Sequence, residues 1–187
     1  MTTQITISAY NGRWPQEFNQ IEKALSAALG PLALRIDHIG STSVPGLGAK
    51  DVIDVQITVA ALTEHARQAL LTAGFQQFRE VASDHVPPDE DPAPENWQKL
   101  LFVQPEGQRR ANIHVRVAGK PNQQYPLLFR DYLRAHPKSA QAVEIIKREL
   151  AKHHGNDVET YYDIKDPVYD LIWDAAQTWA AFTNWQP

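Results

Sequence analysis

The sequence predicts an α/β (α+β) protein in which helices pack on a mixed β-sheet and the C-terminal part, residues 124–187, is helical. Apolar runs of strand length alternate with amphipathic runs of helix length over the first two thirds of the chain, and helical spacing continues to its end. Hydrophobic residues make up 43% of the 187 residues and the chain has five Trp, which is enough for a packed core. We therefore expect one domain spanning residues 1–187.

The first helix is the clearest element because its apolar residues follow helical spacing. Trp14, Phe18, Ile21, Leu25 and Leu29 are separated by 4, 3, 4 and 4 positions, which places them on one helix face, and the Gly-Pro pair that follows ends the helix. Further helices are expected at 63–73, 125–135, 138–153 and 167–183. The expected strands are 4–9, 32–39, 52–59, 75–81, 100–103 and 112–117.

Charge and composition exclude several classes of protein. The absence of Cys excludes a disulfide scaffold and Cys-ligated metal sites. A net charge of −4 argues against general nucleic-acid binding. Residues 84–95 hold five acids and four prolines, which predicts a long acidic loop and leaves 18 basic against 17 acidic residues elsewhere, so that a basic pocket stays open. The chain has no apolar run long enough for a membrane and no signal-peptide pattern, so we expect a cytoplasmic protein.

Two neighbouring segments carry the residue types of a phosphate site. The strand 32–39 ends in Gly40-Ser41-Thr42, and the strand 52–59 carries Asp54 inside an apolar run. A glycine after a strand lets backbone N–H groups approach phosphate oxygens closely. A bound Mg²⁺ or Mn²⁺ would offset the cost of burying the Asp54 carboxylate.

These residues also have plainer interpretations. Ser41 or Thr42 can cap a turn of helix between the two strands. Asp54 can lie near an exposed strand edge, or pair with Arg35 or Lys50. The glycine spacing fits neither a P-loop nor a dinucleotide-binding fingerprint, which excludes those two phosphate motifs.

The order of a Gly-Ser turn, a loop and a strand carboxylate resembles the signature of the nucleotidyltransferase superfamily. The longer run from Asp37 to Lys50, DHIGSTSVPGLGAK, looks like the GrpB family, a group of small proteins placed with that superfamily. The resemblance implies a nucleotidyltransferase-like mixed sheet flanked by helices. It also implies that the Gly40-Ser41-Thr42 turn holds phosphates and that Asp54 holds a metal ion.

Two positions depart from the acids of that superfamily. Gln56 lies two residues after Asp54, on the same strand face, where the superfamily has a second acid. His114, in Asn112-Ile113-His114-Val115, takes the place of the third acid, as in GrpB-like sequences. We expect Asp54 and His114 to be catalytic and Asp54, Gln56 and His114 to surround the metal, with the imidazole as ligand or general base. The alternative for His114 is a half-buried, hydrogen-bonded strand histidine.

Three basic residues are candidates for phosphate binding. Lys50 directly precedes the Asp54 strand, while the runs Phe-Arg-Asp-Tyr-Leu-Arg, with Arg130, and Tyr-Tyr-Asp-Ile-Lys, with Lys165, resemble GrpB blocks. Arg130 and Arg134 are four apart on one helix face, where like charges repel unless an anion lies between them. The alternative is that Asp131 pairs with Arg134 on a solvated face.

The function implied by the resemblance is metal-dependent transfer of a nucleotidyl group from a nucleoside triphosphate to an acceptor that the sequence does not name, with Mg²⁺ or Mn²⁺ as cofactor. The alternative is a catalytically inactive nucleotide- or cofactor-binding module, which the neutral Gln56 and His114 favour. Some GrpB-like domains are fused to a coenzyme A biosynthetic kinase, which suits an accessory or sensing role. A third hypothesis is an interaction protein that uses the loop 84–95. The expected partner is a nucleotide or another phosphate-bearing small molecule.

Overall fold

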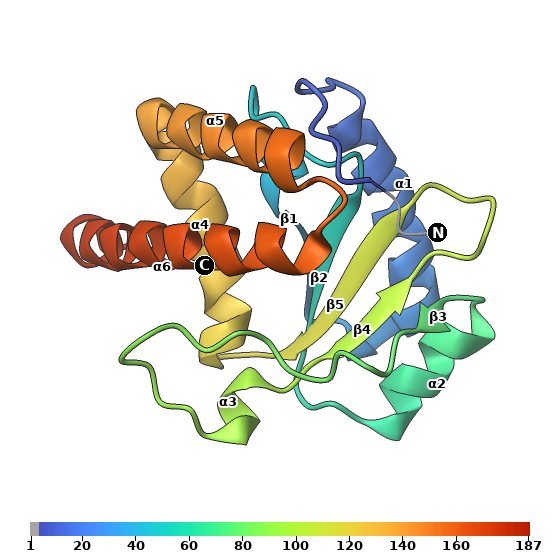
Figure 1. Ribbon diagram of the computed structural model, residues 1–187. Coiled ribbons are helices and arrows are strands. Elements are labelled where there is room, and N and C mark those ends of the chain that lie inside the picture. The colour runs from blue at the N-terminus through green and yellow to red at the C-terminus, as the bar shows by residue number, and fades with distance from the viewer. Residues whose placement is uncertain (1–3) are drawn as a thin grey trace.

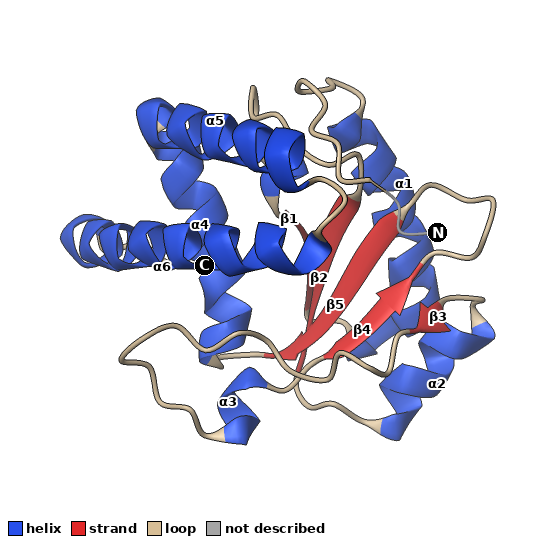
Figure 2. Ribbon diagram, viewed as in Figure 1, coloured by secondary structure: helices blue, strands red, loops and turns tan. Residues whose placement is uncertain are grey.

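A mixed β-sheet forms the centre of the computed structural model, which describes residues 4–187 (Figures 1 and 2). Residues 1–3, part of the segment searched for a signal peptide, lie outside the described residues. The sheet order is β1-β2-β5-β4-β3, and β2 pairs with β5 in parallel while the other pairs are antiparallel. The strands are β1 (Arg35–Ile39), β2 (Ile53–Val59), β3 (Gln76–Gln77), β4 (Leu100–Val103) and β5 (Ala111–Val117). The predicted mixed sheet is confirmed.

Helices cover both faces of the sheet. The helices α1 (Trp14–Leu29) and α2 (Glu64–Thr72) lie on one side, and α4 (Pro121–Ala135), α5 (Pro137–His154) and α6 (Val158–Thr183) lie on the other (Figure 1). The short helical elements are η1 (Gly30–Leu32), η2 (Ser41–Ser43) and α3 (Pro94–Trp97). The helical C-terminal part predicted from the sequence is therefore confirmed, and it is this part that faces the polar side of the sheet.

The side chains of the central strands alternate between an apolar and a polar face. On β2, Ile53, Val55 and Ile57 are fully buried against the apolar stripe of α1, together with Ile113 and Val115 of β5. Burying each such side chain contributes about 1.5–3 kcal/mol. Because strand side chains point alternately to opposite faces, the residues between them turn toward α4, α5 and α6. Burial of the apolar side chains thus fixes the strand register, and this register places the polar side chains of β2 and β5 side by side on the other face.

Three predicted elements differ most in extent from the observed ones. Residues 4–9 form no strand, only a bridge between Ser8 and Ala49, because Ile5 and Ile7 pack on α5 and α6 instead of on the sheet. The strand expected at 75–81 is reduced to the two residues of β3 at the sheet edge. The last helix begins at Val158 instead of 167, where the side chain of Asp157 accepts a hydrogen bond from the Thr160 amide.

Candidate functional site

The Gly-Ser turn is pressed against the strand carboxylate. Gly40 has a φ of 68°, and a Cβ on it would lie 2.4 Å from the Asp54 Oδ2, so that only glycine fits without displacing Asp54. Ser43 closes the turn, because its Oγ donates to the Gly40 carbonyl at 2.6 Å. The sequence prediction that this turn and Asp54 lie together is met by the geometry.

Asp54 is held in place by a neutral partner. The Asn112 Nδ2 on β5 donates to the Asp54 Oδ1 at 2.9 Å, since the strand register puts these two residues side by side. Burial raises the pKa of Asp54, and the Asn112 hydrogen bond and the charges of Lys50 and Arg116 lower it less. A carboxylate in this position is costly as an anion, and a cation beside it would reduce that cost.

The polar face of the sheet forms the floor of a cavity of about 840 Å³. Pairing of β2 with β5 brings Asp54 into the same cavity as His114, although sixty positions separate these two residues in the chain. Seven predicted residues line this cavity: Gly40, Ser41, Thr42, Lys50, Asp54, His114 and Lys165. Two others, Gln56 and Arg130, do not line it.

Gln56 is a structural residue in this arrangement. It is 0% exposed, its Nε2 donates to the Gln123 carbonyl of α4 at 2.9 Å, and its Oε1 accepts from the Arg116 Nη1 at 2.8 Å. Both polar atoms of the amide are therefore used to join β2 to α4 and β5. Contrary to the sequence prediction, Gln56 has no free oxygen to offer a metal ion in the cavity.

Arg130 is likewise occupied outside the cavity. Its guanidinium is buried, donates to the carboxylate of Asp131 at 2.7 and 3.1 Å, and donates to the His38 carbonyl at 3.1 Å. Arg134 donates to the Ser43 carbonyl at 2.8 and 3.1 Å and lies 3.4 Å from Asp131. The contact between Asp131 and Arg134 matches the alternative of that pair, although Arg130 on the same helix is buried and not solvated. Both arginines fasten α4 to β1 and the turn, and Arg130 does not line the cavity.

His114 lines the cavity as a neutral ring. Burial, followed by the charges of Arg116 and Lys99, lowers the pKa of His114 well below its ordinary value. The Arg116 Nη2 lies 3.3 Å from the His114 Nδ1, and because a guanidinium only donates, Nδ1 accepts and the proton sits on Nε2. This tautomer favours a hydrogen-bond donor over the metal ligand or general base that the sequence predicts.

An ion-paired carboxylate from the acidic loop also lines the cavity. Asp84 accepts two hydrogen bonds from Arg116 at 2.8 Å, one from Lys99 at 2.6 Å and one from Asn122 at 3.1 Å. Although burial acts to raise it, the pKa of Asp84 is lowered far below its ordinary value by the Arg116 and Lys99 contacts. Asp84 is thereby committed to ion pairs, and the same pairs anchor the start of the loop 84–95.

Sequence reasoning missed the buried lysine of α5. Lys147 is 3% exposed, and its Nζ donates to the Ser41 Oγ at 2.9 Å and to the Gly48 carbonyl at 2.7 Å. The signal was available, because Lys147 lies between Val143 and Leu150 at helical spacing, on the buried face of the helix. A lysine on an apolar face is an exception that calls for a partner.

An aromatic wall from α4 and α6, also missed, completes the lining. Tyr125 and Phe129 of α4 stack with centroids 6.0 Å apart, and Phe129 stacks on Tyr169 of α6 at 4.7 Å. Tyr161 and Tyr162 line the same cavity from the start of α6. Flat apolar rings beside charged groups are suited to an amphipathic ligand such as a nucleotide.

The cavity offers few free donors for the expected divalent cation. Within residues 4–187, no group of three or more His, Cys, Asp or Glu side chains is arranged to hold a metal ion. Gln56 is engaged elsewhere, and the other two cavity carboxylates, Asp84 and Asp166, are ion-paired, which leaves Asp54 as the cavity carboxylate without an ion pair in the described part of the chain. A pair of metal ions therefore does not fit. One Mg²⁺ held by a single carboxylate and ligand phosphates does fit, because Mg²⁺ is commonly bound in that way.

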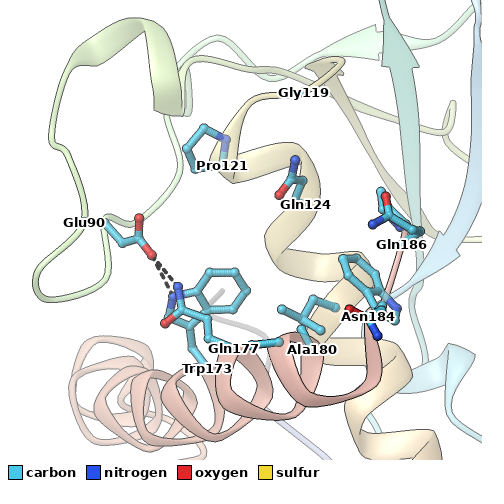
Figure 3. Close-up of a pocket in the computed structure, with 13 residues that line it drawn as sticks. Glu90, Gly119, Pro121, Gln124, Trp173, Gln177, Ala180, Asn184 and Gln186 are labelled. Atoms are coloured by element: carbon cyan, nitrogen blue, oxygen red, sulfur yellow. Dashed lines mark hydrogen bonds between the residues drawn. The ribbon is translucent and has the colours of Figure 1, made fainter.

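A second cavity of about 580 Å³ lies between the acidic loop and the C-terminal end of α6 (Figure 3). In this cavity the Glu90 carboxylate accepts from the Trp173 Nε1 at 3.1 Å and from the Gln177 Nε2 at 2.8 Å, which fastens the loop to α6. The figure shows these three side chains grouped at one side, with Pro121 and Gln124 of α4 opposite. None of the predicted site residues lines it.

Comparisons with known proteins bear on both the family and the fold. A protein of Mycolicibacterium paratuberculosis named dephospho-CoA kinase is 35% identical over 190 residues, which cover 93% of this chain and 46% of that protein. The UPF0157 protein SCO7215 of Streptomyces coelicolor is 34% identical over 167 residues, which cover 88% of this chain and 80% of that protein. The chain spans about half the length of the first of these curated relatives.

The solved structure of the conserved protein GrpB from Enterococcus faecalis has a similar fold. Its TM-score is 0.73 at 24% identity, over 93% of this chain and 99% of that one. Within residues 4–187, no helix combines the length and the apolar character needed to cross a membrane.

The family model described as GrpB protein matches residues 4–174, which is most of the sequence. The chain therefore belongs to the GrpB family, as the run from Asp37 to Lys50 indicated.

Proposed function

We propose that the cavity binds a nucleotide through its phosphate groups. The observation that carries this proposal is the charge of the lining: six Lys or Arg side chains and three Asp face the cavity of a chain whose net charge is −4. Such a local excess of cations favours an anionic ligand. The aromatic wall beside these cations supports a ligand that also has a flat apolar part.

Each predicted residue has a role in this proposal. The backbone of the Gly40-Ser41-Thr42 turn receives a phosphate, and Lys50 and Lys165 balance its charge. Asp54 shares one divalent cation, Mg²⁺ or Mn²⁺, with the phosphates of the ligand, and that cation would neutralise phosphate charge. His114 donates from Nε2 to an acceptor on the ligand.

As the reaction of this site we propose transfer of a nucleotidyl group from a nucleoside triphosphate to an acceptor. The support is the order of a Gly-Ser turn and a strand carboxylate, in contact at the cavity, together with the family resemblance. A non-catalytic binding module is the second candidate. It is favoured by the engagement of Gln56, which leaves one carboxylate where two-metal catalysis needs more.

The relatives named dephospho-CoA kinase suggest which ligands to include in a test. Their name refers to whole proteins about twice as long as this chain, so a link to coenzyme A metabolism is a proposal here. We include dephospho-CoA as a probe beside the common nucleoside triphosphates, because it combines an adenine ring with a diphosphate.

The test is calorimetric titration of ATP, GTP, CTP, UTP and dephospho-CoA into the protein with Mg²⁺, with Mn²⁺ and with EDTA. We expect one of these ligands to bind more tightly with a divalent cation, and Asp54→Ala to remove that metal dependence. Asp163→Ala is the matched control, since Asp163 is exposed on α6 and does not line the cavity. Absence of binding by the wild-type protein under all three conditions would contradict the proposal. If a divalent cation still tightens ligand binding in Asp54→Ala, Asp54 does not hold the cation.

A further inference from the structure

Three lysines from three different elements line the same cavity and act electrostatically on one another. Lys50 comes from the loop before β2, Lys147 from α5 and Lys165 from α6, and all three line the cavity beside Ser41. We propose that these lysines form a binding site for a chain of two or more linked phosphates, and that such a ligand joins α5 and α6 to the Gly40–Lys50 loop. The inference rests on the proposed function and names the ligand class, a di- or triphosphate.

Lys147 supplies the buried centre of this lysine cluster. Its Nζ already makes two hydrogen bonds to the loop, one to the Ser41 Oγ and one to the Gly48 carbonyl. An ammonium group has three donors, so one remains for a ligand. Burial, with the charges of Lys50 and Lys165 adding, lowers the pKa of Lys147 to about 7. The charges of Lys50 and Lys165 are thus felt at Lys147, as expected for one cluster.

Lys50 and Lys165 lie close to the same aromatic ring. The Lys50 Nζ is 4.9 Å from the Tyr162 ring centroid and donates to the Tyr162 hydroxyl at 2.5 Å. The Lys165 Nζ is 5.0 Å from the same centroid and 4.1 Å from that of Tyr169. Tyrosine rings attract cations through their π faces but bring no negative charge to compensate them.

Carboxylates only partly compensate this charge. Lys165 pairs with Asp166, whereas within residues 4–187 neither Lys50 nor Lys147 has a carboxylate within 4.0 Å. The nearest acid on α5, Glu144, is used by the Gly48 amide and by Arg148. The charges of Glu144 and Asp54 also act on Lys147, but neither forms an ion pair with it, so the three lysines are only partly compensated and leave room for added negative charge.

A linked polyphosphate fits this arrangement better than a single phosphate. One phosphate can be held by one lysine and the turn, but ammonium groups on three separate elements match charges that are spread along a ligand. Binding would replace repulsion between α5, α6 and the loop by attraction to a shared anion. We therefore expect polyphosphate to stabilise the fold through these contacts, by linkage.

The first experiment measures the thermal unfolding midpoint with orthophosphate, pyrophosphate and tripolyphosphate at matched ionic strength, with EDTA present. We expect the midpoint to rise from orthophosphate to pyrophosphate to tripolyphosphate in the wild-type protein. Lys147→Met is expected to lose most of the pyrophosphate shift, and Lys147→Arg to retain part of it. Lys152→Met is the matched control, because Lys152 lies on the same helix and is exposed.

A full pyrophosphate shift in Lys147→Met, or an equal loss in Lys152→Met, would overturn the inference. An orthophosphate shift as large as the pyrophosphate shift would show that linked phosphates are not required, which also overturns it. If Lys147→Met does not fold, the test uses the wild-type protein instead. The rate of acetylation of each lysine is then measured by mass spectrometry with and without pyrophosphate. Pyrophosphate must then slow the acetylation of Lys50, Lys147 and Lys165 and leave Lys152 unchanged, and unaltered rates would reject the cluster.

These outcomes separate the cluster from the proposed function. Nucleotide binding that leaves the three lysines unprotected would reject the cluster and keep the nucleotide site. Pyrophosphate protection without binding of any nucleotide would keep the cluster and reject the nucleotide as its ligand.

Discussion

The contact between Gly40 and Asp54 ties the shape of the turn to the position of the carboxylate. The glycine supplies a positive φ and an empty Cβ position, and the Asp54 Oδ2 occupies the space that a side chain would need. Gly46, in the same loop, also has a positive φ but nothing within 4 Å of its Cβ position. Comparing substitutions at these two glycines therefore distinguishes the effect of backbone strain from that of a steric clash.

We expect Gly40→Ala to lower the free energy of unfolding by about 1–3 kcal/mol more than Gly46→Ala, because it adds a steric clash to the strain that both share. Urea unfolding of both variants measures the difference. Gly40→Ala is also expected to weaken metal-dependent nucleotide binding by displacing Asp54, whereas Gly46→Ala is expected to retain it. Equal losses of stability in the two variants would show that Asp54 moves aside freely.

The contacts of the site were predictable from the sequence where the residues involved lie close together in the chain. The Gly40 turn and Asp54 are close in sequence, and their residue types indicated both contact and charge. The partners that keep Gln56 and Arg130 out of the cavity lining come from distant segments, Arg116 in one case and the His38 carbonyl in the other. One sequence does not reveal which distant donors compete for a side chain.

At the scale of elements, the parallel pairing of β2 with β5 assembles the site. It puts Asp54 beside Asn112 and Gln56 beside His114, and α4 closes over Gln56 through the Gln123 carbonyl. The strands and helices themselves were largely predictable from apolar spacing. Their pairing was not, because a parallel neighbour distant in sequence leaves no periodic signal in either strand. The short β3 shows the same limit at the sheet edge.

Gln56→Met tests the structural role that we assign to this amide. The substitution leaves the buried Gln123 carbonyl and one Arg116 donor without a partner, so we expect the free energy of unfolding to fall by about 1–3 kcal/mol for each. Metal and nucleotide affinity of the folded variant, measured by calorimetry, should stay within about twofold of wild type. Reduced metal affinity with unchanged stability would instead make Gln56 a ligand, as the sequence predicted.

At the scale of the whole molecule, the helical part and the sheet are joined across a basic cavity. Lys147 contributes to this contact through Ser41 and Gly48, and its pKa of about 7 lies below the ordinary value of 10.5. Between these values the unfolded chain binds a proton that the folded protein does not, so stability rises with pH. The groups that set the charge around Lys147 are Glu144, Lys50, Lys165 and Asp54.

We therefore expect the stability penalty of Lys147 to be complete below about pH 7 and to diminish as the pH rises toward 9. Urea unfolding across that range should show increasing stability for the wild-type protein and a flatter profile for Lys147→Met. The profile of Lys152→Met should follow the wild type. Parallel profiles for wild type and Lys147→Met would mean that Lys147 titrates normally in the folded protein.

Hydrogen–deuterium exchange with and without the tightest nucleotide, in the presence of Mg²⁺, tests the central claim most directly because it locates the ligand. We predict slower exchange in residues 40–42 and 49–50, in α5 around Lys147 and in α6 over residues 161–169, where the lining residues of the larger cavity lie. Slowing confined to the C-terminal end of α6 would place the ligand in the second cavity (Figure 3). That result, or exchange unchanged by any nucleotide, would contradict a nucleotide site on the polar face of the sheet.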